Sequence, residues 1–87
     1  MRDLKELRHE IDSIDTKIVD LIERRMSVSK EVGDYKASIG MPIYDPSREK
    51  EVIEKRIALL NDKKLEKDIG EIFELIMKLS RDKQVRE

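Results

Sequence analysis

The 87-residue sequence lacks the residues that build several common kinds of site. It has no cysteine, which excludes disulfides and thiolate chemistry and is compatible with the reducing cytoplasm, where we expect the protein to act. Its single histidine excludes a multi-histidine metal site, and we expect neither a metal nor a cofactor. Its apolar runs are only a few residues long, so we expect neither a transmembrane helix nor the core of a signal peptide.

Charge is abundant in this chain, but it is balanced. Charged residues make up 45% of the sequence, whereas the formal net charge is only −1. Such a balance gives no overall attraction to nucleic acid or to an anionic membrane, so we expect neither as a partner. With only three glycines and two prolines, the composition suits helices. The length allows one domain at most, and we assign residues 1–87 to a single all-α domain.

The first part of the chain predicts one long helix over about residues 3–39. Asp3 is suited to cap its start, and Gly40 followed by Pro42 is typical of a helix end. Gly33 lies inside this span, costs about 1 kcal/mol relative to alanine, and offers an earlier end. We favour a continuous helix because the same apolar seam continues on both sides of Gly33.

Two shorter helices are expected after the long one. Asp45 followed by Pro46 is a strong helix start and predicts a second helix over about 46–60. A polar break over 61–64 separates it from a third helix over about 66–85. The third helix has an apolar stripe that two polar residues continue: Ile69, Ile72, Phe73, Ile76, Met77, Ser80 and Gln84.

The seam of the long helix contains one exception to its apolar character. Ten of its eleven positions are apolar or aromatic, and the remaining one is Arg25. A buried guanidinium without a partner is too costly to persist, so we expect an anion to meet it. The seam consists of Leu4, Leu7, Ile11, Ile14, Ile18, Leu21, Arg25, Val28, Val32, Tyr35 and Ile39.

A second cation faces nearly the same way as Arg25. Lys36 follows it by eleven positions, which places the two about 20° apart around the helix and ~16.5 Å apart along it. Long side chains at these positions are able to grip one small anion between them. Arg8 lies next to the same seam, but at ~25 Å from Arg25 it is too far to reach that anion within one chain.

The length of the first helix predicts a dimer. The helix would extend about 54 Å, whereas a compact chain of this size has a radius of gyration of about 12 Å. Its seam therefore needs a second chain, and we expect an antiparallel homodimer, with a monomeric helical hairpin as the alternative. If the two-fold axis lies near residue 19, the partner's Arg8 completes each of two equivalent sites.

The shorter helices add polar residues at unusual positions. Arg48 is a cation in the first turn of the second helix, where the helix dipole favours anions. Ser80 and Gln84 occupy the inward stripe of the third helix, where leucine or isoleucine is expected. Each feature alone is typical of a solvated face, but their joint occurrence with Arg25 indicates a polar site.

These residues resemble the all-helical (AroQ) class of chorismate mutases over essentially the whole chain. The segments that carry the resemblance are 7–12, 14–15, 31–33 and 42–49, together with Arg25, Lys36, Ser80 and Gln84. The set is specific as a whole, although no fragment of it is. The resemblance implies a three-helix chain in an intertwined antiparallel homodimer of the chorismate mutase type II kind. It also implies conversion of chorismate to prephenate in phenylalanine and tyrosine biosynthesis.

The resemblance implies a site that works by binding and by fixed charge. Arg25 and the partner's Arg8 would bind the two carboxylates of chorismate. Lys36 would contact a carboxylate and the ether oxygen, and Gln84 would donate to that same oxygen. The reaction is a rearrangement within one molecule that needs no nucleophile, metal, cofactor or proton transfer. The expected mechanism is therefore to hold the substrate folded and to stabilise negative charge on its ether oxygen.

Four further residues complete the implied site. Glu49, which we also expect to act in catalysis, and the backbone at Asp45 would hold the ring hydroxyl. Arg48 and Ser80 would complete the shell around the carboxylates. Every polar position of the family pattern is filled by the expected residue type.

Two other functions remain open from the sequence. A related helical enzyme that eliminates pyruvate from isochorismate shares the arginines and the lysine but lacks an acid at the position of Glu49, which favours the mutase. A non-catalytic antiparallel helical dimer explains the seam, but it does not explain why Arg25, Ser80 and Gln84 occur together.

Overall fold

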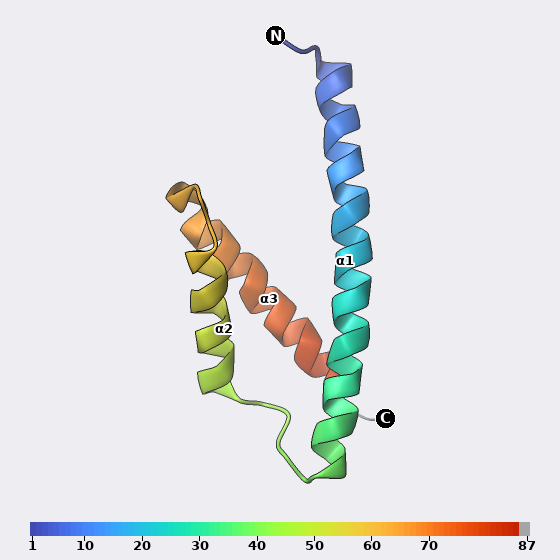
Figure 1. Ribbon diagram of the computed structural model, residues 1–87, viewed down its shortest axis with the longest axis vertical. Coiled ribbons are helices and arrows are strands. Elements are labelled where there is room, and N and C mark those ends of the chain that lie inside the picture. Colours follow the sequence, from blue (N-terminus) through green and yellow to red (C-terminus); the bar gives the residue numbers. More distant parts are fainter. Residues whose placement is uncertain (86–87) are drawn as a thin grey trace.

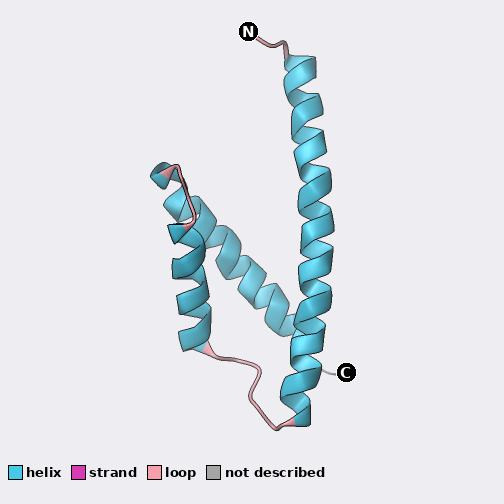
Figure 2. Ribbon diagram, viewed as in Figure 1, coloured by secondary structure: helices cyan, strands magenta, loops and turns pink. Residues whose placement is uncertain are grey.

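The computed structural model describes residues 1–85, which form three α-helices and one short 3-10 turn (Figure 1). In chain order the elements are α1 (Leu4–Ser38), α2 (Pro46–Ala58), η1 (Lys63–Leu65) and α3 (Glu66–Gln84). Loops connect the helices, and no strand occurs in this range (Figure 2). The prediction of an all-α chain with three helices is confirmed. Within the same range, none of the helices has the length and apolar character that a bilayer crossing requires.

Local sequence signals explain both ends of α1. The carboxylate of Asp3 accepts a hydrogen bond from the backbone N–H of Glu6 at 2.8 Å, which caps the first turn. After the last turn, Gly40 has a φ of 68°, a conformation that glycine adopts without steric cost. This allows the N–H of Met41 to donate to the carbonyl of Lys36 at 2.8 Å, as in a Schellman motif.

The later helices also begin at side-chain caps or turns. Asp45 accepts a hydrogen bond from the N–H of Arg48 at 3.0 Å, and Pro46 occupies the first turn of α2. Asp62 accepts from the N–H of Lys64 at 3.1 Å, which starts the η1 turn that leads directly into α3. The chain therefore reverses direction after α2, and α3 runs back toward the C-terminal half of α1 (Figure 1).

α3 is the central element, because it packs against both α1 and α2. Its last turn crosses α1 at Gly33, which is buried. A Cβ atom built on Gly33 would lie 2.5 Å from the Cα of Gln84, so only glycine lets the two backbones approach this closely. α1 continues through Gly33, as expected. The glycine that weakens the helix locally is thus required by its tertiary contact.

The core of the single chain is small. Among residues 1–85, the buried apolar side chains are those of Val52 and Met77, and Ser29 and Ser80 are also buried. Ile72, which the sequence pattern places on the inward stripe of α3, is 51% exposed. Little apolar surface is therefore removed from water by the contacts within one chain.

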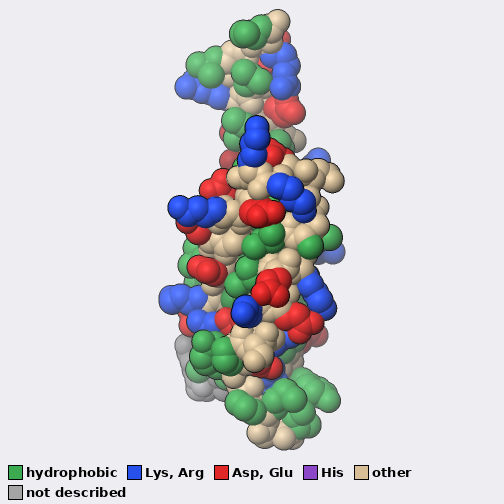
Figure 3. All heavy atoms as spheres, turned by 90° about the vertical axis from the view of Figure 1, so that its left-hand side faces the viewer, with side chains coloured by type: hydrophobic (Ala, Val, Ile, Leu, Met, Phe, Trp, Pro, Cys, Tyr) green, Lys and Arg blue, Asp and Glu red, His purple; other side chains and the backbone are tan. Residues whose placement is uncertain are grey.

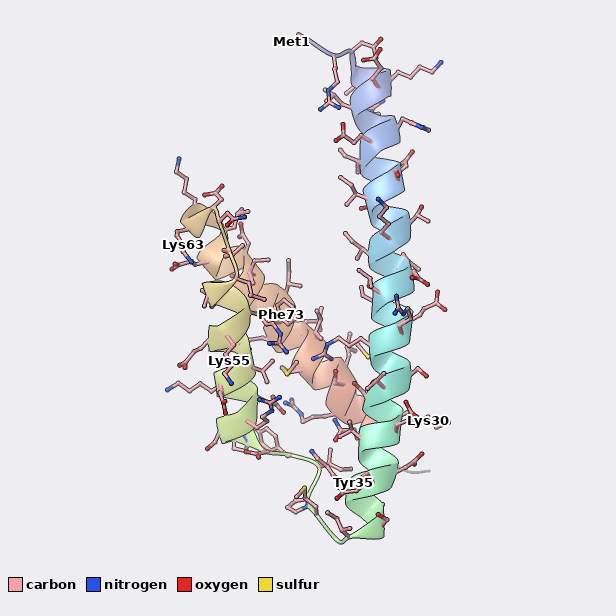
Figure 4. The ribbon with its side chains drawn as sticks, viewed as in Figure 1. Met1, Lys30, Tyr35, Lys55, Lys63 and Phe73 are labelled. Carbon is pink, nitrogen blue, oxygen red and sulfur yellow. The ribbon has the colours of Figure 1, made fainter. Side chains whose placement is uncertain are left out.

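The N-terminal half of α1 projects from the rest of the molecule, and its side chains stand without neighbouring helices (Figures 1, 3 and 4). The radius of gyration is 16.3 Å, against ~12 Å for a compact chain of this length. The accessible surface of 7414 Å² exceeds that of a compact 10.3 kDa monomer by about 2,000 Å². The exposed apolar side chains of this half are Leu4, Leu7, Ile11, Ile14, Ile18, Val19, Leu21 and Ile22.

Candidate active site

The three helices and the loop after α1 line a cavity of about 660 Å³. Its lining residues come from the C-terminal half of α1, the loop before α2, α2 itself and the C-terminal half of α3. Arg8 does not reach it and instead lines a separate surface pocket near the start of α1. The other seven residues predicted from the sequence all line the cavity: Arg25, Lys36, Asp45, Arg48, Glu49, Ser80 and Gln84.

Arg25 of α1 and Ser80 of α3 meet on one wall of this cavity. The Nη1 atom of Arg25 donates to the Oγ of Ser80 at 2.5 Å. Burial lowers the pKa of Arg25 from its ordinary value, and the nearby positive charge of Arg56 lowers it further. Since the serine hydroxyl is neutral, it does not compensate the charge of the guanidinium. An anion that enters the cavity would offset this desolvation and repulsion.

Lys36 ties the loop after α1 to the cavity. Its Nζ donates to the backbone carbonyl of Ile43 at 2.9 Å, seven residues further along the chain. An ammonium group carries three donors, so this bond leaves capacity for a ligand. Lys36 therefore restrains the loop through its hydrogen bond to Ile43 and, at the same time, presents a positive charge to the cavity.

Gln84, in the last turn of α3, presents an amide whose Oε1 is buried and has no hydrogen-bond partner among the described residues. An unpaired buried polar atom costs about 1–3 kcal/mol, so such atoms are normally satisfied. A side-chain amide carries an acceptor at one end and two donors at the other, and rotation exchanges the two ends. Gln84 also lines the cavity, so its amide fits a group that binds a polar atom of a ligand there.

Glu49 is engaged by a residue that our interpretation of the sequence did not include. Arg81 of α3 forms an ion pair with Glu49 of α2, in which Nη1 donates to Oε1. The same guanidinium lies 4.7 Å from the centre of the Tyr44 ring, within cation–π range. The hydrogen bond to Glu49 is the main reason why the pKa of Arg81 is raised. Arg81 thus connects α3, α2 and the loop before α2.

The cavity carries an excess of positive charge. Arg56 of α2 also lines it, is half-buried, and was likewise absent from the predicted site. No group of three potential metal ligands occurs among residues 1–85. A site with this balance of charge favours a small molecule that carries more than one negative charge. The charged residues of the wall are the cations Arg25, Lys36, Arg48, Arg56 and Arg81 and the anions Asp45 and Glu49.

Comparison with known proteins then decides the family. A family model described as chorismate mutase type II matches residues 7–85. The chain belongs to the chorismate mutase type II family. The matched range contains all eight residues that the sequence predicted for the site, Arg8 included. Membership of the family makes the chain an isomerase of aromatic amino acid biosynthesis.

Relatives of known name and structure support the assignment to this family. A chorismate mutase of Methanocaldococcus jannaschii is 39% identical over 75 residues, which are 85% of this chain and 76% of that protein. A bifunctional chorismate mutase/prephenate dehydratase of Aquifex aeolicus is 44% identical over 59 residues, or 68% of this chain but only 16% of that longer protein. A solved structure of a conserved hypothetical protein from Pyrococcus furiosus superposes with a TM-score of 0.79 at 35% identity, covering 94% of this chain and 95% of the other.

Proposed function

We propose that two copies of this single-domain chain form a homodimer that rearranges chorismate to prephenate in the cytoplasm. The ether C–O bond of chorismate breaks as a C–C bond forms within the same molecule, and no proton is transferred. The observation that carries the proposal is the convergence of seven residues of the family pattern on one positively charged cavity. These residues are distributed over all three helices and the loop before α2, so only the folded chain brings them together.

The cations of the cavity hold the two carboxylates of the substrate. Arg25 binds one carboxylate, and this contact offsets the desolvation that lowers its pKa. The partner's Arg8 binds the other, while Arg48 and Ser80 complete the shell. Binding a flexible dianion at both ends holds it in the folded conformer from which the new bond forms, and such orientation lowers the barrier.

Lys36 and Gln84 act on the ether oxygen. Negative charge grows on this oxygen as the C–O bond breaks, so donors aimed at it bind the transition state more tightly than the substrate. One well-placed donor contributes about 3–4 kcal/mol, and two donors with conformer selection reach the ~8 kcal/mol at the low end of enzymatic acceleration. Glu49 and the backbone at Asp45 hold the ring hydroxyl and fix the orientation of the ring.

A second chain is needed both for stability and for the site. The N-terminal half of α1 exposes its apolar side chains in the single chain. The excess accessible surface of about 2,000 Å² is comparable with the area that obligate dimers bury. Antiparallel pairing of two α1 helices about residue 19 places the partner's Arg8 opposite residue 30. This position lies midway between Arg25 and Lys36, which line the cavity, whereas the chain's own Arg8 lines a separate pocket.

The direct test is to incubate the purified chain with chorismate, follow the loss of its ultraviolet absorbance, and identify the product by chromatography. Arg25→Ala should nearly abolish turnover while the protein remains a helical dimer by circular dichroism and gel filtration. Arg24→Ala is the matched control, because Arg24 is exposed and pairs with Asp20 at 3.8 Å outside the cavity. Absence of prephenate with the wild-type chain, or full activity of Arg25→Ala, would contradict the proposal.

Sharing of the site between two chains is tested by mixing inactive variants. An exchanged dimer of one Arg8→Ala chain and one Arg25→Ala chain has one intact site and one site that lacks both arginines. Random exchange of equal amounts should therefore restore about a quarter of wild-type activity. If mass spectrometry proves exchange and no activity returns, the site is not shared in this way.

A further inference from the structure

Arg81 has no part in the mechanism described above, although it contacts two other residues of the cavity wall. Its guanidinium bonds to Glu49 and lies over the ring of Tyr44. Side-chain exposure is 19% for Glu49 and 31% for Arg81, so the pair is largely shielded from water. A shielded carboxylate beside the binding site of a dianion repels that dianion, and the mechanism described above does not explain how this repulsion is offset.

We propose that Arg81 is a positioning residue that cancels the negative charge of Glu49 and holds its carboxylate ready for the ring hydroxyl of the substrate. This inference rests on the function proposed above. Without Arg81, the carboxylate of Glu49 would repel both carboxylates of chorismate from inside the cavity. With Arg81, the pair is close to neutral, and Glu49 keeps its capacity to accept a hydrogen bond.

The geometry of the ion pair fits this task. Arg81 donates to Oε1 of Glu49, and an ionised carboxylate has further acceptor sites, including those on Oε2, for a hydroxyl donor. The contact with Tyr44 restrains the plane of the guanidinium. Because Glu49 lies on α2, Tyr44 in the loop and Arg81 on α3, the three side chains fix one face of the cavity from three segments.

The first experiment measures the steady-state kinetics of Arg81→Gln with chorismate. We expect KM to rise about tenfold, equivalent to ~1.4 kcal/mol, and kcat to change much less. Arg81→Lys, which restores the charge, should recover part of the loss in KM. Lys83→Leu is the matched control, because it removes an exposed cation from the same turn of α3 without touching the cavity. Its KM should equal that of the wild type.

The second experiment repeats Arg81→Gln in a Glu49→Gln background. Neutral glutamine leaves no carboxylate for Arg81 to neutralise or to hold, whereas the direct attraction of Arg81 for the dianion remains. The further loss from Arg81→Gln should therefore be smaller than the loss of about tenfold in the wild-type background. The dissociation constant of prephenate, measured by calorimetry, provides the same cycle independently of turnover. Circular dichroism and gel filtration establish that each variant keeps the fold and the oligomeric state of the wild type.

Each outcome of this cycle has a definite meaning. An unchanged KM in Arg81→Gln, or an equal loss with and without the Glu49 carboxylate, overturns the positioning role, even when the wild-type chain converts chorismate normally. A loss that Arg81→Lys does not reduce also overturns it. A wild-type chain that forms no prephenate refutes the proposed function itself, and the two failures are thereby distinguished.

Discussion

Replacing Gly33 by alanine should separate activity from stability. The new Cβ would lie 2.5 Å from the Cα, 2.6 Å from the carbonyl oxygen and 2.9 Å from the Cβ of Gln84. Ordinary contacts of such an atom begin near 3.4 Å, and the obstructing atoms belong mainly to backbone rather than to the tip of a flexible side chain. The last turn of α3 must therefore move away from α1 by about 1 Å.

Two opposing effects determine the change in stability. Alanine favours the helix by about 1 kcal/mol, whereas overpacking at a close contact costs about 1–3 kcal/mol. The net loss of folding free energy should therefore be only about 0–2 kcal/mol, because the end of α3 is free to move. Activity has no such compensation. In the proposed mechanism, the shift displaces Gln84 from the ether oxygen, and a misplacement of about 1 Å costs about 100-fold in rate.

The measurement compares kcat on chorismate with thermal unfolding followed by circular dichroism at one fixed protein concentration. Gly70→Ala is the matched control, because its Cβ would lie an ordinary 3.7 Å from Cδ1 of Ile57. This control should gain up to about 1 kcal/mol of stability and keep the wild-type kcat. A wild-type kcat in Gly33→Ala would refute the reasoning, since the close approach of α1 would then not position Gln84.

Two further predictions concern protonation and charge. Gln84→Glu should work best at acid pH, since only a protonated glutamate donates to the ether oxygen; a flat pH profile of kcat would argue against this contact. Burial and Arg56 lower the pKa of Arg25 but leave it charged near neutral pH, so the cost of holding its charge persists throughout that range. A dicarboxylate such as malate should therefore raise the melting temperature more than chloride at equal ionic strength, and Arg25→Ala should lose this difference.

The helices were predictable because their ends depend on neighbouring residues. Asp3 and Asp45 each accept a hydrogen bond from an N–H three positions later, and Gly40 adopts the conformation that ends α1. Such signals lie within a few residues of one another in the sequence. The candidate site was predictable for a different reason, because the resemblance to a family supplied positions on all three helices before their arrangement was known.

Arg81 and Arg56 line the cavity but were not predicted from the sequence. Arg81 directly follows the inward-facing Ser80, so a helical pattern turns it away from the stripe by about 100°. Only the placement of α2 beside α3 brings it to Glu49, 32 positions away in sequence. Arg56 could have been found, since it lies on the apolar side of its helix, which is the same signal that identified Arg25.

The helix propensity of Gly33 does not reveal why a glycine is needed at this position. The sequence alone presents it as a loss of about 1 kcal/mol of helix propensity and as an alternative end of the helix. The structure shows that a side chain at this position would collide with the backbone at Gln84. Propensity measures only the helix in isolation, whereas the distance between two helices depends on residues far apart in the chain.

The length of α1 explains why assembly and catalysis are coupled in the proposed dimer. Within this helix of 35 residues, Arg8 and Arg25 lie ~25 Å apart along the axis, so no bending of one ordinary helix brings both to the same substrate. The apolar residues between them are exposed to water in the single chain, and an exposed apolar face of this length marks an interaction surface. In the proposed dimer, the same stretch buries its seam against a second chain and delivers Arg8 to that chain's cavity. Dilution that separates the dimer should then remove activity and helical stability together, whereas a chain that kept either one alone would show that the two are independent.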